Sequence, residues 1–166
     1  MARCAAAGDD LTTLSLKRGW PLLLLFVGGV IGIGYVVGLI AAPGPWLAEL
    51  RIPDLVLPDS ISTPLWFLLA TAFAVAGWRL WVLDSASLEM RLWLGIQILS
   101  WWYAPVFFLI RSTLLALIII LIMAVLMVWF MLRAWRSDRI SLYLFIPCFL
   151  WVAYVVAMNA AIVVMN

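Results

Sequence analysis

The chain has 166 residues, of which 68% are hydrophobic and 11% are charged, and its mean hydropathy is +1.20. This composition excludes a water-soluble globular domain, because too few polar residues remain to cover an apolar core. The net charge of +2 gives no sign of a nucleic-acid-binding surface, so we expect no nucleic-acid partner. The sequence therefore predicts an integral membrane protein whose main partner is the lipid bilayer.

The order of charged and uncharged segments predicts the domain organisation. Residues 1–18 have mixed charge and no apolar periodicity, and we expect a flexible N-terminal tail. Residues 19–166 contain five uncharged runs longer than about 18 residues, the length that crosses a bilayer about 30 Å thick. The chain is thus predicted to be an all-α integral membrane protein, a single five-transmembrane-helix bundle with helices at about 20–42, 63–81, 91–110, 112–135 and 140–164.

The first predicted helix is rich in glycine. Gly28 and Gly32, and again Gly34 and Gly38, have the small-xxx-small spacing that lets another backbone approach closely. The spacing is compatible with a homodimer seam, with close packing inside the bundle, or with the ordinary tolerance of membrane helices for glycine.

The connection at 43–62 is the one long loop between the predicted helices. It contains four prolines, one tryptophan and three acidic residues, and we expect a structured cap on the membrane surface. In the next helices, 91–110 contains the sequence SWWYAPVFF at 100–108, and 112–135 is almost purely aliphatic. We expect this aliphatic helix to be scaffold that faces lipid.

The distribution of basic residues predicts the orientation. Eight of them fall on the N-terminal side of the membrane and two, Arg51 and Arg111, on the other side. By the positive-inside rule, the N-terminus is cytoplasmic and the C-terminus lies outside, in a plasma or inner membrane. The eight are Arg3, Lys17, Arg18, Arg79, Arg91, Arg133, Arg136 and Arg139.

Few residues in the predicted spans can carry chemistry. The chain has no histidine, its acidic residues fall in the tail and loops, and Cys4 and Cys148 match no metal-ligand spacing. Proton-coupled transport and zinc or di-iron catalysis usually place such groups inside the bundle. We therefore predict no catalytic residue, no metal site and no resident cofactor.

Eleven tryptophans remain as the unusual feature. Most lie near span ends, where an aromatic belt accounts for them. Trp101, Trp102 and Trp151 lie near span centres, where an indole N–H needs an acceptor. The pattern favours a cavity for a large planar apolar ligand, with the long loop as its lid; aromatic residues that only fill a helix interface are the alternative. The belt group is Trp20, Trp46, Trp78, Trp81, Trp93, Trp129 and Trp135.

Three segments carry a resemblance to a known family. The last helix reads PCFLWVAYVVAMN at 147–159, the third reads QILSWWYAPVFF at 97–108, and the loop pattern places Trp46, Leu50, Pro53, Pro58, Trp66 and Arg79 in register. Over about 46–166 the chain resembles the TspO/translocator proteins, also called tryptophan-rich sensory proteins or peripheral-type benzodiazepine receptors. It departs from the family pattern at three places. Ile52 stands where a lysine is usual, Ser100 or Trp101 where an asparagine is usual, and Cys148 where a tyrosine is usual.

The resemblance implies a five-helix bundle, often a homodimer, that binds porphyrins such as protoporphyrin IX. Some members bind isoquinoline or benzodiazepine drugs and sterols. Because the chain has no histidine, a metal-free tetrapyrrole is a better candidate than haem. A membrane tetrapyrrole-binding sensor or carrier is the main hypothesis; a light-dependent porphyrin-degrading enzyme and a structural or regulatory membrane protein without a ligand are the alternatives.

The residues expected to bind the ligand come from the loop and three helices. The rings are expected to stack on the ligand, Ser100 and Asn159 to hydrogen-bond to its edge, and Arg51 to pair with a propionate. The full set is Trp46, Arg51, Trp66, Ser100, Trp101, Tyr103, Phe107, Phe108, Trp151, Tyr154, Val155 and Asn159.

Overall fold

The computed structural model describes residues 19–53 and 56–166, so the predicted tail at 1–18 lies outside the described residues. Within the described part the fold is all-helical, with five long helices and one short 3-10 helix. These are α2 (Trp20–Ile40), η1 (Pro45–Glu49), α3 (Asp59–Asp84), α4 (Leu88–Phe108), α5 (Thr113–Ser137) and α6 (Arg139–Met165).

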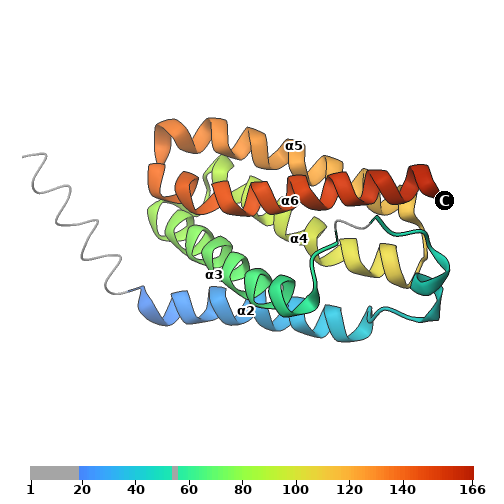
Figure 1. Cartoon of the computed structure of the whole chain (residues 1–166). Coiled ribbons are helices and arrows are strands. Elements are labelled where there is room, and N and C mark those ends of the chain that lie inside the picture. The colour runs from blue at the N-terminus through green and yellow to red at the C-terminus, as the bar shows by residue number, and fades with distance from the viewer. Residues whose placement is uncertain (1–18, 54–55) are drawn as a thin grey trace, which may run out of the picture.

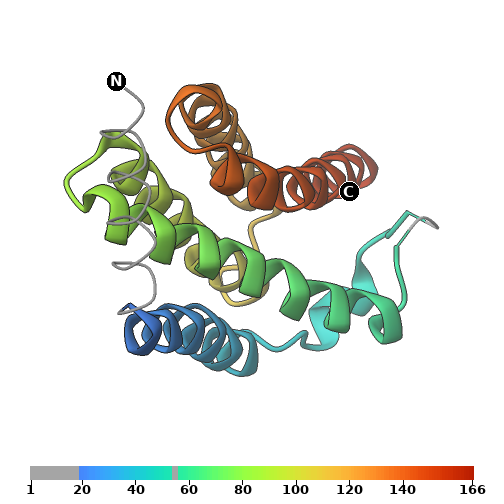
Figure 2. The ribbon, with the colours of Figure 1, turned by 90° about the vertical axis from the view of Figure 1, so that its left-hand side faces the viewer.

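The long helices lie side by side in one elongated bundle (Figure 1). α2 packs against α3 and α4, α4 packs against α5, and α5 packs against α6, which in turn contacts α3. Seen along the bundle, α2 lies on one side, α5 and α6 lie on the other, and α3 and α4 lie between them (Figure 2). The loop after α2 and the C-terminal end of α6 lie at the same end of the bundle (Figure 1).

Four of the described helices, α2, α3, α5 and α6, are long and apolar enough to cross a membrane. They make the chain a multi-pass integral membrane protein, as the sequence predicts. α4 has 21 residues, as many as α2, but the charged residues Glu89 and Arg91 and the polar Gln97 lower its mean hydropathy. The predicted span at 91–110 therefore matches a helix of sufficient length, but α4 is not among the described helices that are apolar enough to cross a membrane.

The largest difference from the predicted boundaries is at α3, which was expected at 63–81 and runs from Asp59 to Asp84. Pro58 is extended, with φ −64° and ψ 149°, and ends the loop. Asp59 then places a carboxylate in the first helical turn, where the helix dipole favours negative charge. The loop is correspondingly shorter than the predicted 43–62 and includes the turn η1.

Close packing of α3 on α4 depends on one tryptophan and one glycine. Trp93, expected in the aromatic belt, is only 4% exposed, and its indole N–H donates to the carbonyl oxygen of Phe73 at 2.9 Å. The Trp93 and Phe73 rings stack with centroids 5.1 Å apart. Gly77 faces the Trp93 ring so closely that any Cβ there would overlap it. Glycine at 77 is therefore required for this helix contact.

The end of the bundle opposite the loop is held by a buried ion pair. Arg79 of α3 donates to both carboxylate oxygens of Asp138, at 3.2 and 3.0 Å, and Ser141 Oγ donates to Asp138 at 2.6 Å. The Asp138 carboxylate also accepts from the backbone N–H of Ile140 and caps α6. Burial acts to raise the pKa of Asp138, but the hydrogen bonds from Arg79 and Ser141 and the charge of Arg79 outweigh it and lower this pKa.

We expect Asp138→Asn to lower the free energy of unfolding by about 2 to 3 kcal/mol, because Arg79 would lose its charged partner while the helix cap is retained. The contribution of Asp138 should be present above pH about 4 and be lost as the pH falls through its lowered pKa. Unfolding in detergent, followed by circular dichroism between pH 3 and 7, measures both effects.

Arg136→Gln is the matched control, since this arginine is exposed at the same end of the bundle and makes no ion pair within the described residues. If Asp138→Asn were no less stable than Arg136→Gln at pH 7, the proposed role of the ion pair would be wrong.

Candidate ligand-binding site

A cavity of about 610 Å³ lies between the five long helices, and each of them contributes to its wall. This volume falls within the range of about 300 to 1,000 Å³ that is usual for small-molecule sites. The wall consists mainly of apolar and aromatic side chains. The bundle therefore encloses a site that is large enough for an organic ligand.

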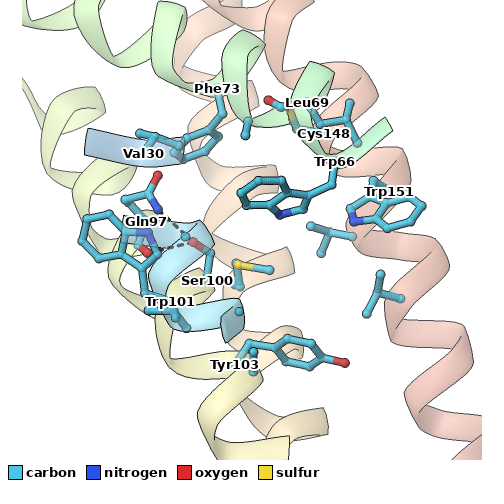
Figure 3. Close-up of a pocket in the computed structure, with 18 of the residues that line it drawn as sticks. Val30, Trp66, Leu69, Phe73, Gln97, Ser100, Trp101, Tyr103, Cys148 and Trp151 are labelled. Carbon is cyan, nitrogen blue, oxygen red and sulfur yellow. Dashed lines mark hydrogen bonds between the residues drawn. The ribbon is translucent and has the colours of Figure 1, made fainter. Parts of the chain in front are cut away.

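Aromatic rings occupy several sides of the cavity. The Trp66 ring of α3 lies near its centre, and Trp151 of α6 lies on one side of it (Figure 3). The Trp101 and Tyr103 rings come from α4 on the other side (Figure 3). Phe73, the ring that stacks on Trp93, also lines the cavity. These flat surfaces are suited to stacking on a planar ligand.

Gly34 of α2 gives the Trp66 ring its position. A Cβ built on Gly34 would lie 2.8 Å from Cζ2 and 3.1 Å from Cη2 of that indole. The glycine backbone thus forms the surface on which the ring rests, which is the intramolecular close packing that the small-xxx-small spacing allows. Gly28 and Gly32, by contrast, have no atom within 4 Å of such a Cβ among the described residues.

The polar groups of the α4 wall are largely occupied by one another. Ser100 Oγ donates to the Gln97 backbone carbonyl at 2.8 Å and accepts from Gln97 Nε2 at 3.0 Å. The Ser100 hydroxyl proton is therefore not free for a ligand. Gln97 Oε1 and Trp101 Nε1 are buried and have no hydrogen-bond partner within the described residues.

Tyr103 and Asn159 form a second polar pair. Asn159 is 2% exposed, and its Nδ2 donates to Tyr103 Oη at 2.6 Å and to the Val155 carbonyl at 2.9 Å. Tyr103 lines the cavity, whereas Asn159 does not. The Tyr103 hydroxyl acts as an acceptor in this pair and keeps its own proton. Asn159 thus positions the Tyr103 hydroxyl from behind the wall. Asn159 itself does not line the cavity, although we expected it to hydrogen-bond to the edge of the ligand.

The structure divides the twelve residues expected at the site into two equal groups. One group lines the cavity: Trp66, Ser100, Trp101, Tyr103, Trp151 and Val155. The other group lies outside its wall: Trp46, Arg51, Phe107, Phe108, Tyr154 and Asn159.

Most of the residues outside the wall connect the loop to α4 and α6. Trp46 packs edge-on against Phe107 with ring centroids 5.8 Å apart, beside Phe108. The backbone N–H of Leu57 donates to Tyr154 Oη at 3.1 Å.

Arg51 is joined to the end of the chain through its backbone, whose N–H and carbonyl both pair with the Asn166 side chain. No described residue between α2 and α3 lines the cavity. The described part of the loop therefore covers the end of the bundle, and of the predicted loop 43–62 only Ser62, which the structure places in α3, lines the cavity among the described residues.

The cavity opens instead to the side. Among its lining residues, Tyr35 is 56% exposed, Leu39 is 62% exposed and Phe67 is 38% exposed. They lie in the last turns of α2 and the first turns of α3. Both helices are apolar enough to lie in a membrane.

Several lining residues were not among the expected site residues. The aliphatic helix α5, expected to be scaffold, supplies Ile120, Met123 and Met127. Their i, i+3, i+7 spacing is the signal of one shared helix face. Cys148 also lines the cavity, and its thiol donates to the Leu69 carbonyl at 3.5 Å.

Comparison with models of known families finds a match to the TspO/MBR family over residues 23–165, which is nearly the whole chain. A search of curated proteins finds no match.

We expect Gly34→Ala to move the Trp66 ring into the cavity, because the added methyl group would overlap the far edge of the indole. With 5-fluorotryptophan incorporated, the ¹⁹F resonance of Trp66, assigned with Trp66→Phe, should shift. Gly38→Ala is the control, since Gly38 also lines the cavity but has nothing within 4 Å of its Cβ position. An unchanged resonance in Gly34→Ala would contradict the described contact.

Proposed function

The chain belongs to the TspO/MBR family, and from this membership we propose that it binds a tetrapyrrole or a similarly planar apolar molecule between its five helices, as a membrane sensor or carrier. The observation that carries the proposal is the cavity of about 610 Å³ with tryptophan rings in its wall. A bundle that served only as a scaffold would gain stability by filling such a space, because cavities in a packed interior are costly.

Affinity in this proposal comes mainly from stacking. Trp66 and Trp151 present their rings to the open space from two different helices, so a flat ligand can contact both (Figure 3). Aromatic pairs contribute about 0.5 to 1.5 kcal/mol beyond the burial of their area, and a buried aromatic side chain adds about 1.5 to 3 kcal/mol. Tight binding of a planar ligand then needs few hydrogen bonds from the wall.

Orientation of the ligand would come from Tyr103. Its hydroxyl is held by Asn159 and retains a proton for an acceptor on the ligand, such as a carbonyl oxygen or a ring nitrogen. A metal-free tetrapyrrole is favoured over haem because the chain has no histidine; Cys148, Met123 and Met127 are the side chains of the wall with a sulfur that haem iron could bind.

Three further features belong to the same proposal. α4 crosses the membrane with the other four helices, its polar residues facing the cavity. The N-terminus lies in the cytoplasm and the C-terminus outside, as the basic residues favour. The chain forms a homodimer, for which the open backbone at Gly28 and Gly32 on α2 offers a place of close approach.

Titration of the purified protein in lipid nanodiscs with protoporphyrin IX tests the proposal. We expect saturable quenching of tryptophan fluorescence, with Trp151→Ala raising the Kd on the order of tenfold to thirtyfold because one stacking surface is lost.

Trp102→Ala is the matched control for Trp151→Ala. Trp102 is on α4 next to Trp101, is 59% exposed and does not line the cavity. Its removal should leave the Kd unchanged once the smaller fluorescence signal is accounted for. Equal effects of the two substitutions would show that the porphyrin binds elsewhere, and the absence of saturable quenching would contradict the proposed function.

A further inference from the structure

A groove lies at the end of the bundle opposite the loop, between the start of α4 and the last turns of α5 (Figure 1). Its volume is about 520 Å³, and it shares no lining residue with the cavity between the helices. We call it the α4–α5 groove. Its lining residues are Glu89 from α4 and Trp129, Leu132, Arg133, Arg136 and Ser137 from α5.

The side chains of the α4–α5 groove change from apolar to basic along α5. Trp129 and Leu132 come first and are exposed, and Arg133 and Arg136 follow one turn later. Spacings of three, four and seven residues place these four side chains on one face of the helix. An exposed apolar surface therefore continues directly into a basic one.

This change falls at the end of a predicted membrane span. α5 has 25 residues and is apolar enough to cross a bilayer. At about 1.5 Å per residue, a helix of this length is longer than the hydrocarbon layer of about 30 Å. Arg136 and Ser137, in its last turn, therefore lie at the level of the lipid headgroups, and Trp129 lies at the level of the acyl chains.

The two arginines of the groove have hydrogen-bond donors to spare. Arg133 Nε lies 3.4 Å from a carboxylate oxygen of Glu89, and the rest of its guanidinium group makes no interaction with a described residue. Arg136 makes no hydrogen bond or ion pair with its side chain in the described part of the chain. Guanidinium groups bind phosphate oxygens through pairs of parallel hydrogen bonds.

Glu89 holds Arg133 in place without cancelling the charge of the groove. It is buried in the first turn of α4, so its carboxylate keeps the Arg133 guanidinium against the groove. Two arginines against one glutamate leave an excess of one positive charge. The groove is therefore suited to an anion that also has an apolar part.

We propose that the α4–α5 groove binds an anionic phospholipid, with its phosphate on Arg133 and Arg136 and an acyl chain along Leu132 and Trp129. Such a lipid has the same order of groups along its length, a charged phosphate followed by apolar chains. A free phosphate would match the arginines and leave both exposed apolar side chains without a partner. Basic pockets between membrane helices are known to hold anionic headgroups.

Native mass spectrometry of the whole chain, released from detergent micelles, tests this site by counting bound lipids. The probes are phosphatidylglycerol, which is anionic, and phosphatidylcholine with the same acyl chains, which has no net charge. We expect phosphatidylglycerol to bind about fivefold more tightly, and Arg136→Gln to raise its Kd about fivefold, because each basic residue near an anionic headgroup contributes about that factor. The fold should be retained, since Arg136 is exposed and has no partner among the described residues.

Arg91→Gln is the matched control. Arg91 is exposed on α4 two residues after Glu89 and does not line the groove. The substitution removes the same charge from the same end of the bundle and should leave the Kd for phosphatidylglycerol unchanged. Equal effects of Arg91→Gln and Arg136→Gln would show attraction without a site and would overturn the proposal.

Glycerol phosphate, which has the phosphate without the acyl chains, distinguishes a lipid from a free phosphate compound. A large excess of it should leave phosphatidylglycerol bound, because the chains contribute through Leu132 and Trp129. Displacement by glycerol phosphate would overturn the assignment to a lipid. Phosphatidylglycerol that binds no more tightly than phosphatidylcholine, or equally well to Arg136→Gln, would show that the arginines serve only to complement the dipole at the end of α5.

Discussion

Two contacts between an indole ring and a glycine set the spacing of the first three long helices. Trp93 of α4 packs on Gly77 of α3, and Trp66 of α3 packs on Gly34 of α2. In lipid, helices gain little from the hydrophobic effect and associate through close packing and internal hydrogen bonds. The Trp93 contact has both, because its N–H also donates to the Phe73 carbonyl. The cavity depends on this spacing, since it lies where α2, α3 and α4 face α5 and α6.

The ligand chemistry follows from the same choice of residues. In the proposed function, a wall of rings and aliphatic side chains offers area for stacking, and the Tyr103 hydroxyl held by Asn159 offers direction. The ion pairs of the described residues, Arg79–Asp138 and Arg133–Glu89, lie away from the cavity. The Arg79–Asp138 pair lies at the end opposite the loop, where it fixes α3 to the start of α6. The ion pair that joins α3 to α6 and the cavity therefore lie in different parts of the bundle.

Much of the fold could be predicted from the uncharged runs, since a bilayer requires apolar helices of fixed minimum length. Depth in the spans singled out Trp101 and Trp151, which line the cavity, but also Trp102, which is exposed and does not. Trp46 and Phe107 were expected at the ligand but pack on each other outside the cavity wall. Their sequence pattern suits a pocket and a packing pair equally well, and only three-dimensional proximity separates these roles. Ile120 and Met123 were missed because an aliphatic residue against a ligand has the same sequence signal as one against lipid.

The central claim is that a planar ligand lies between the helices, with its ring against Trp66 and Trp151. A crystal structure of the chain with protoporphyrin IX tests it most directly. The account predicts the macrocycle inside the cavity, in contact with both indoles and with an acceptor atom within hydrogen-bond distance of Tyr103 Oη. A macrocycle on the lipid-facing surface of the bundle, or beneath the loop beside Trp46, would contradict it.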